Sequence, residues 1–234
     1  MPEEHLMPTL TTTVAQLREY LTSKLSDEQL QDIITSLGTD IEEFGEQLKV
    51  EIFPDRPDLL SVPGLARAIN TYVKKPFAHN YSVAPATTTV RITKDVASVR
   101  PHTRCLIARK VQLTEDRLEQ LIDLQEKLHI TYGRDRKKVA IGVYPLKDIT
   151  LPITYTALKP QDIVFTALEM HEELPITQIT EQHPTAKKYA HLLEGATRYP
   201  VFIDAKNTIL SVPPLINSKD AVRYTLIALS CLLK

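Results

Sequence analysis

The chain has 234 residues, of which 43% are hydrophobic and 24% are charged, and 28 Lys and Arg face 29 Asp and Glu. This is the composition of a globular protein with one large core or two modest ones. Near neutrality excludes nucleic-acid binding driven by overall charge, so any such binding has to depend on a local basic patch.

Three further classes are disfavoured by the sequence. The apolar run Tyr224–Leu233 is too short to span a bilayer. Cys105 and Cys231 lie far apart in apolar surroundings, which predicts reduced, buried thiols and no zinc site. The charged, proline-containing start of the chain does not have the pattern of a signal peptide. We therefore expect a soluble, cytoplasmic protein without a membrane partner.

Residues 1–76 are predicted to form a small α+β domain. Thr13 caps a first helix, and Ser26-Asp-Glu-Gln has the pattern of a capping box for a second helix that ends at Gly38. Residues 41–53 alternate as one or two strands with a turn at Gly45–Glu46, and a third helix follows with Pro63 in its first turn. The first half of this domain is acidic, and the domain contains no set of catalytic residues.

A connector at 77–98, with strands expected from residue 81, leads to a larger domain at 99–220. The elements expected there are strands at 104–113, 139–143, 153–157 and 163–168, a helix after Thr114 and a helix after Pro184. His129 lies at the edge of the first helix's apolar stripe and is predicted to be packed, not catalytic. Strands outnumber helices and do not alternate with them, which indicates an α+β fold with a mixed sheet.

The domain closes with a predicted hairpin, Tyr199–Ile203 and Thr208–Val212, joined by the polar residues 204–207. Pro213-Pro214 is expected to give an extended exit that presents Asn217. Such a lip either lines a pocket or only ends a sheet. In the apolar tail 221–234, Tyr224, Ile227, Ala228 and Cys231 are expected to share one helix face, which could also serve self-association.

Few residues have the pattern of a chemical site. The sequence contains no phosphate-binding glycine loop and no nucleophile elbow. His171-Glu-Glu-Leu is interpreted as a solvated loop, and no metal site or protein nucleophile is predicted. A basic cluster, Arg134, Arg136, Lys137 and Lys138, could contact phosphate. The alternative is that these cations are favoured simply because they follow a helix C-terminus.

Three passages together resemble the β subunit of phenylalanine–tRNA ligase in its archaeal and eukaryotic form. They are EIFPDRPDLLSVPGLARAI at 51–69, LIDLQEKLH continuing to KVAIGV at 121–143, and YAHLLEG at 189–195 with the hairpin that follows. The resemblance covers roughly residues 8–220. It implies the N-terminal domain of that subunit followed by a tRNA-editing domain, which hydrolyses tyrosine mischarged onto phenylalanine tRNA.

The resemblance also implies residues for an editing pocket. Ser211, Pro214 and Asn217 match the family's Leu-Ser-x-Pro-Pro-Ile-Ile-Asn run, and Phe202 would lie on the neighbouring strand. Such a pocket selects the tyrosine hydroxyl by a hydrogen-bonding group that phenylalanine would leave unpaired. Hydrolysis of the ester then needs mainly a positioned water and donors for the oxyanion. Relatives show His-Asp-Leu-Asp where this chain has Tyr144-Pro-Leu-Lys, a difference that removes two acidic groups and makes Tyr144 a further pocket candidate.

After Asp220 the match ends, and the strand that completes the family's pocket is replaced by the apolar tail. The resemblance implies tRNA(Phe) as a partner. It also implies that the interface for the α subunit is missing here, and that ATP and magnesium belong to the full synthetase, so no cofactor is expected in this chain and ligation is excluded. The alternative to an editing enzyme is a non-catalytic RNA- or protein-binding remnant.

Overall fold

The computed structural model describes residues 7–74, 82–109, 111, 114–221 and, for the backbone path, 229–233. The chain forms two compact units, Met1–Val83 with Glu119–Tyr132 and Ala84–Leu118 with Gly133–Lys234. Compactness thus groups 119–132 with the N-terminal unit, whereas the sequence-based division at 76 and 99 assigned it to the larger domain. The α+β class is confirmed, since each unit combines helices with its own sheets.

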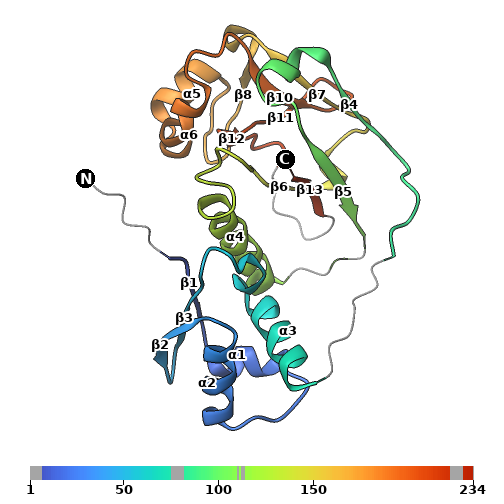
Figure 1. The fold of residues 1–234 in the computed structure, drawn as a ribbon. Helices are drawn as coiled ribbons and strands as arrows, with labels where there is room; N and C mark the ends of the chain where they lie inside the picture. The colour runs from blue at the N-terminus through green and yellow to red at the C-terminus, as the bar shows by residue number, and fades with distance from the viewer. Residues whose placement is uncertain (1–6, 75–81, 110, 112–113, 222–228, 234) are drawn as a thin grey trace. The chain divides into compact units, whose positions relative to one another are not determined.

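The first unit packs its helices with a small antiparallel sheet of order β1-β3-β2 (Figure 1). Its elements are β1 (Thr9–Thr12), α1 (Val14–Glu19), α2 (Asp27–Ser36), β2 (Asp40–Phe44), β3 (Leu48–Glu51), α3 (Val62–Val73) and most of α4 (Glu115–Ile130). Leucine and isoleucine side chains from α1, α2, β3 and α3 form one buried core, and Leu124 and Leu128 of α4 pack against it. His129 is buried, as predicted.

The helix caps of this unit are the ones that the sequence predicted. Ser26 Oγ accepts from the backbone N–H of Gln29, whose side chain accepts in return from the N–H of Ser26. Thr13 caps α1, and Gly38 follows α2 with a φ of +78°. Each cap satisfies backbone donors or acceptors that the helix itself leaves unpaired. The helix starts and ends here follow from local chemistry.

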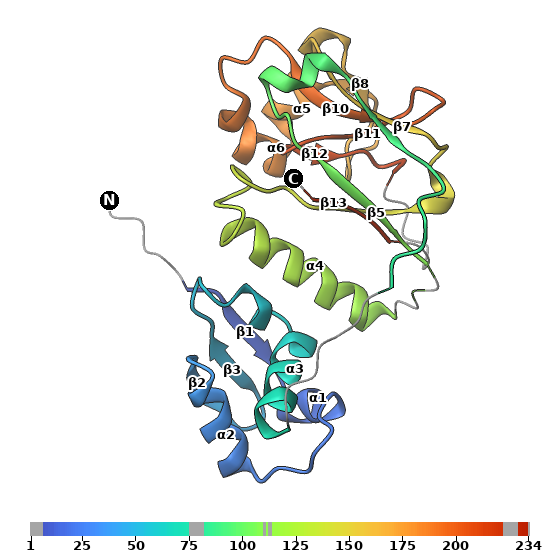
Figure 2. The same ribbon diagram turned by 45° about the vertical axis from the view of Figure 1, so that its right-hand side comes forward.

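The second unit is built around a five-stranded mixed sheet of order β12-β11-β10-β7-β4 (Figure 2). Only the β4–β7 pair is parallel within this sheet. The strands and helices of the unit are β4 (Val90–Ile92), β5 (Arg104–Ala108), β6 (Gly142–Pro145), β7 (Ile153–Leu158), β8 (Val164–Phe165), β9 (Leu174–Pro175), α5 (Ile176–Gln182), α6 (Pro184–Tyr189), β10 (Tyr199–Ile203), β11 (Ile209–Val212), β12 (Ile216–Asn217) and β13 (Leu229–Leu233).

Alternation along the strands sends side chains into two separate clusters. Val201, Val212 and Ile216 pack in one cluster with residues of α5 and α6. Tyr155, Phe202 and Leu210 belong to the other, together with Tyr144 of β6. The predicted hairpin is therefore confirmed, and its two faces have different neighbours.

Several expectations were wrong in detail. The strand expected at 139–143 is β6, which begins at Gly142 and runs to Pro145. Pro213-Pro214 does not give an extended exit, because Leu215 N–H donates to Val212 O over 2.8 Å and closes a four-residue turn over the two prolines.

Two further corrections concern the tail and Cys105. Residues 229–233, which include Cys231, form β13 between β5 and β6 and not part of a helix. Pairing on both sides explains this, because a strand satisfies its backbone through two neighbours. Tyr224, Ile227 and Ala228 lie outside the described residues. Cys105 is exposed, not buried. Helix α5 and strand β1 were missed.

No helix in the described part of the chain combines the length and apolarity needed to cross a membrane. Among the same residues, no group of three or more His, Cys, Asp or Glu side chains is arranged to hold a metal ion.

Candidate ligand site on the five-stranded sheet

Four residues face one another directly across neighbouring strands of the sheet. Phe202 of β10 is paired with Tyr155 of β7 on one side and with Ser211 of β11 on the other, and Ser211 is paired with Asn217 of β12. Directly opposed residues project to the same face of a sheet. We call Tyr155, Phe202, Ser211 and Asn217 the cross-strand row. Three of the predicted pocket residues are thus brought together.

The aromatic half of the row is tightly packed. The rings of Tyr155 and Phe202 stack with centroids 4.2 Å apart and an angle of 17° between their planes. The Tyr155 hydroxyl donates to the backbone oxygen of Arg100 over 3.0 Å. Burial raises the pKa of Tyr155 to about 12, against an opposing effect of the Arg100 charge. Tyr155 is therefore a neutral donor at physiological pH.

The polar half of the row, Ser211 and Asn217, is contacted by a side chain from a strand outside the five-stranded sheet. Tyr144 of β6 is 2% exposed, and its hydroxyl donates to Oδ1 of Asn217 over 2.8 Å. Ser211, also 2% exposed, has no hydrogen-bond partner for its Oγ among the described residues. The site therefore holds an amide oxygen that accepts from a phenol, beside a buried hydroxyl.

A buried aspartate fixes the loop of the hairpin that carries Phe202 and Ser211. Asp204 Oδ1 accepts from the N–H groups of Lys206 and Thr208 over 2.8 and 2.9 Å, and Oδ2 accepts from Thr150 N–H over 3.1 Å. Burial alone would raise the pKa of Asp204, but these backbone donors outweigh it and the pKa is lowered. One carboxylate thus holds β10 and β11 in register with the segment before β7.

The hairpin register includes one extra residue. Phe202 pairs with Ser211 and Ile203 pairs with Ile209, which leaves Leu210 as a bulge. A bulge makes two residues oppose one and re-aims side chains. Leu210 accordingly packs in the same cluster as Phe202. The bulge explains how Leu210 reaches the face on which Phe202 and Ser211 lie.

Pro214, a further predicted pocket residue beside Tyr144, lies in the turn between β11 and β12 and is buried. Its carbonyl oxygen accepts from Nη1 of Arg136 over 3.4 Å, as does that of Leu215. The Arg136 guanidinium also lies 4.4 Å from the centre of the Tyr189 ring. Arg136 therefore braces the turn that precedes Asn217.

This separates Arg136 from the rest of the basic cluster. Arg134, Asp135 and Arg136 have φ values of 48°, 52° and 61°, a conformation that costs about 1 kcal/mol or more per non-glycine residue. The contacts of Arg136 with the turn help to offset that cost. Arg134, Lys137 and Lys138 are exposed. Only these three present charge to solvent as a phosphate site requires.

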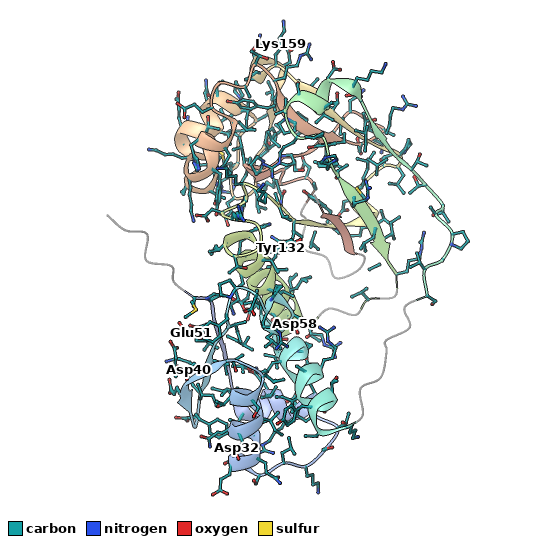
Figure 3. All side chains as sticks on the ribbon, viewed as in Figure 1. Asp32, Asp40, Glu51, Asp58, Tyr132 and Lys159 are labelled. Atoms are coloured by element: carbon teal, nitrogen blue, oxygen red, sulfur yellow. The ribbon has the colours of Figure 1, made fainter. Side chains whose placement is uncertain are left out.

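The N-terminal unit carries a group of acidic side chains on its surface, in contrast to the exposed cations of the basic cluster. Asp32 and Asp40, both exposed, and the half-buried Glu51 lie on this unit (Figure 3). Further exposed acids there are Asp27, Glu28, Glu42, Glu43 and Glu46. An acidic surface repels phosphate. This part of the first unit is therefore poorly suited to nucleic acid.

Sequence reasoning missed two members of this site. Tyr155 could have been found, because Ile153, Tyr155 and Ala157 alternate as one buried face of a strand. Gly142 could not have been found, because the need for glycine there depends on where the Tyr144 ring lies. A Cβ built on residue 142 would be 2.7 and 2.8 Å from two carbons of that ring. Chemically, the site combines a phenol-accepting amide, a buried hydroxyl and a stacked aromatic wall.

Comparisons with known proteins agree on one family. A family model described as the Phe-tRNA synthetase beta subunit B1 domain matches residues 7–75. The β subunit of phenylalanine–tRNA ligase from Methanosphaera stadtmanae is 34% identical over 215 residues, which cover 91% of this chain and 38% of the relative. The one from Methanosarcina acetivorans is 38% identical over 186 residues, 79% of this chain and 34% of the relative.

A solved structure gives the same result in three dimensions. The crystal structure of an N-terminal fragment of the phenylalanyl-tRNA synthetase β-subunit from Pyrococcus horikoshii has a TM-score of 0.86 and 30% identity. The match covers 97% of this chain and 68% of that fragment. The chain spans little more than a third of the curated relatives' length.

Proposed function

Because this chain belongs to the phenylalanyl-tRNA synthetase β-subunit family, whose N-terminal part it matches, we propose that it is an editing-type module that binds the 3′ end of tRNA(Phe) and hydrolyses Tyr-tRNA(Phe). The observation that carries the proposal is the hydrogen bond from a phenol hydroxyl to Oδ1 of Asn217 at 2.8 Å. An acceptor that a phenol already satisfies is the group needed to tell tyrosine from phenylalanine. In this proposal the editing activity belongs to translation in the cytoplasm.

Selection of tyrosine depends on the polar half of the cross-strand row. A tyrosine side chain satisfies the amide oxygen of the half-buried Asn217, whereas phenylalanine would leave that oxygen without a partner. The stacked pair of Tyr155 and Phe202 supplies an apolar wall beside it. A site built around a hydrogen bond to the substrate hydroxyl rejects the analogue that lacks it far better than an apolar pocket rejects an added hydroxyl.

The reaction needs no protein nucleophile. Water attacks the carbonyl carbon of the aminoacyl ester, the bond from that carbon to the ribose oxygen breaks, and the ribose oxygen takes up a proton. Free tyrosine and uncharged tRNA result. The buried hydroxyl of Ser211 is the donor in the row that is best suited to an oxyanion. No residue of this chain is assigned to ATP or magnesium.

Contact with the tRNA backbone is proposed for Arg134, Lys137 and Lys138, which are exposed, while Arg136 is occupied with the turn. Their replacement by alanine should weaken tRNA binding and lower the slope of log affinity against log salt by about 2 to 3. Replacement of Lys94, Lys159 and Lys206, exposed lysines of the same unit, is the matched control. The α subunit is a partner of the whole synthetase in this proposal, without an assigned surface here.

The direct test is release of tyrosine from Tyr-tRNA(Phe) by the purified chain in excess over tRNA. We expect hydrolysis faster than in buffer, slower hydrolysis of Phe-tRNA(Phe), and a loss of that preference in Asn217→Ala. A rate equal to that in buffer would overturn the proposal. Salt-dependent tRNA binding without hydrolysis would instead support a non-catalytic RNA-binding remnant, which the filling of the site by Tyr144 also favours.

A further inference from the structure

Tyr144 occupies an unusual place for a tyrosine. It is 2% exposed, its hydroxyl donates to Asn217, and it belongs to the same cluster as Tyr155, Phe202 and Leu210. The residue that meets Asn217 comes from β6, which is in a different sheet from β12. A phenol from elsewhere in the fold thus reaches the one amide of the cross-strand row.

The ring of Tyr144 can take this position because residue 142, two positions earlier in β6, is a glycine and has no side chain. Gly142 and Tyr144 lie on the same face of β6, since side chains alternate along a strand. A Cβ on residue 142 would lie 2.7 Å from Cε2 and 2.8 Å from Cζ of Tyr144, closer than van der Waals contact permits. The ring therefore lies folded back along its own strand, in space that any residue other than glycine would fill.

Ser211 supplies a second, independent observation. Its Oγ is buried and has no hydrogen-bond partner among the described residues, although it lies directly opposite Asn217. Burying an unpaired hydroxyl costs free energy, so such groups in native proteins call for an explanation. A ligand that brings a second polar group to the row would satisfy it. Tyr144 reaches Asn217, whereas Ser211 Oγ has no partner in the part of the chain that the structure describes.

We propose that Tyr144 is an internal plug at the Asn217 end of the cross-strand row, where its ring occupies the place that a para-substituted phenol would take. The plug mimics the side chain of tyrosine, the ligand that the proposed function requires. Ligand and plug compete for the same amide oxygen, so the apparent affinity for a phenol is reduced by the fraction of molecules in which Tyr144 has moved out. Effects on ester hydrolysis rest on the proposed function, whereas phenol binding does not.

Binding of p-cresol to the full chain tests this without tRNA, with toluene as the probe of the same shape that lacks the hydroxyl. Tyr144→Ala removes the ring and leaves a cavity of the kind that accepts small aromatic molecules. We expect this variant to bind p-cresol at least about tenfold more tightly than the unchanged chain, and about fivefold more tightly than it binds toluene. Calorimetric titration and the rise in Tm with ligand concentration measure both.

Two further variants identify the groups involved. Gly142→Ala keeps Tyr144 but removes the room for its ring, and should open the same site to p-cresol. Adding Asn217→Ala to Tyr144→Ala should abolish the preference for p-cresol over toluene. A folded Tyr144→Ala or Gly142→Ala protein that binds p-cresol no better than toluene would overturn the proposal, as would tight p-cresol binding by the unchanged chain.

A measurement on the unchanged side chains covers the case in which both variants fail to fold. In protein labelled with fluorotyrosine, the Tyr144 resonance, assigned by its loss in Tyr144→Phe, should shift with saturating p-cresol and not with toluene. A resonance that ignores both ligands contradicts displacement. If Tyr-tRNA(Phe) is never hydrolysed while the variants bind p-cresol, the proposed function fails and the plug stands. If Tyr-tRNA(Phe) is hydrolysed but the variants bind p-cresol no better than toluene, the plug fails and the proposed function stands.

Discussion

The rings of Tyr155 and Phe202 lie parallel within 17° and 4.2 Å apart, on strands that are paired in direct register. This stacked pair is the apolar wall of the cross-strand row. The Tyr155 hydroxyl extends beyond the stack to the backbone of Arg100, so one side chain serves both packing and a hydrogen bond. The stack is thereby tied to the segment that precedes β5.

Phe202→Ala should destabilise the protein by roughly 3–5 kcal/mol, because it removes a buried ring and leaves a cavity. Phe202→Leu, which keeps an apolar side chain, should cost clearly less. Urea unfolding followed by circular dichroism measures both. Val164→Ala, at a residue that is 42% exposed in the same unit, is the control and should change the free energy of unfolding by about 0.5 kcal/mol or less. Equal effects at the two positions would contradict the packing role.

Asp204→Asn should destabilise the hairpin in a pH-dependent way. The folded pKa of Asp204 is lowered, so its ionised form contributes stability above the unfolded pKa of about 3.9, and this contribution is lost as pH falls through the lower folded value. The difference in unfolding free energy between the two proteins should therefore be largest above about pH 5 and shrink below about pH 4. A difference that grows on acidification would be incompatible with the hydrogen bonds described. Asp162→Asn, at an exposed carboxylate of the same unit, is the matched control.

His183→Ala should cost about 1–2 kcal/mol of stability. His183 caps α6: its Nδ1 accepts from Thr185 N–H over 3.2 Å, and its Nε2 donates to Leu168 O over 3.0 Å. His183→Asn keeps an acceptor for the helix start and should recover part of the loss. Thermal unfolding is the readout, with the exposed His191→Ala as control. If His191→Ala is equally harmful, the cap is not the cause.

Ser26→Ala should destabilise the first unit by about 1 kcal/mol, because it removes the side-chain acceptor of the capping box at the start of α2. Ser36→Ala replaces an exposed serine at the other end of the same helix and should be close to neutral. Hydrogen exchange of the Gln29 amide gives a local measurement, since that N–H donates to Ser26 Oγ. Unchanged protection of this amide would count against the cap.

The elements that the sequence predicted well are those whose signals lie within a few residues. Ser26, Gly38 and the polar loop after Ile203 each have a local hydrogen-bonding or conformational reason that is readable from residue type. Ser211 and Asn217 were instead selected through the resemblance, by the one family motif that contains both. The motif spans only seven residues, so the hairpin and the turn after it are enough to bring these two residues opposite each other.

The remaining features depend on contacts between distant residues. Tyr144 and Asn217 are separated by 73 positions, and nothing near Tyr144 indicates which side chain it meets. Arg136 looked like one cation of a basic run, yet a left-handed backbone turns it toward Tyr189 and the β11–β12 turn. The bulge at Leu210 likewise becomes visible only once β10 and β11 are paired. Tertiary packing, not local propensity, decided each of these.

The turn between β11 and β12 has a consequence for how the chain can vary. Val212 faces Ile216 across it, and side chains alternate from there on, so Asn217 projects to the opposite face from Ile216. Loss of one residue from 213–215 would bring Asn217 opposite Val212, among the residues that pack with α5 and α6, and away from Tyr144. Substitutions in this turn change how well the site is held, but a change in its length removes the site altogether. Natural variants and designed libraries should therefore tolerate new residue types here far better than a single insertion or deletion.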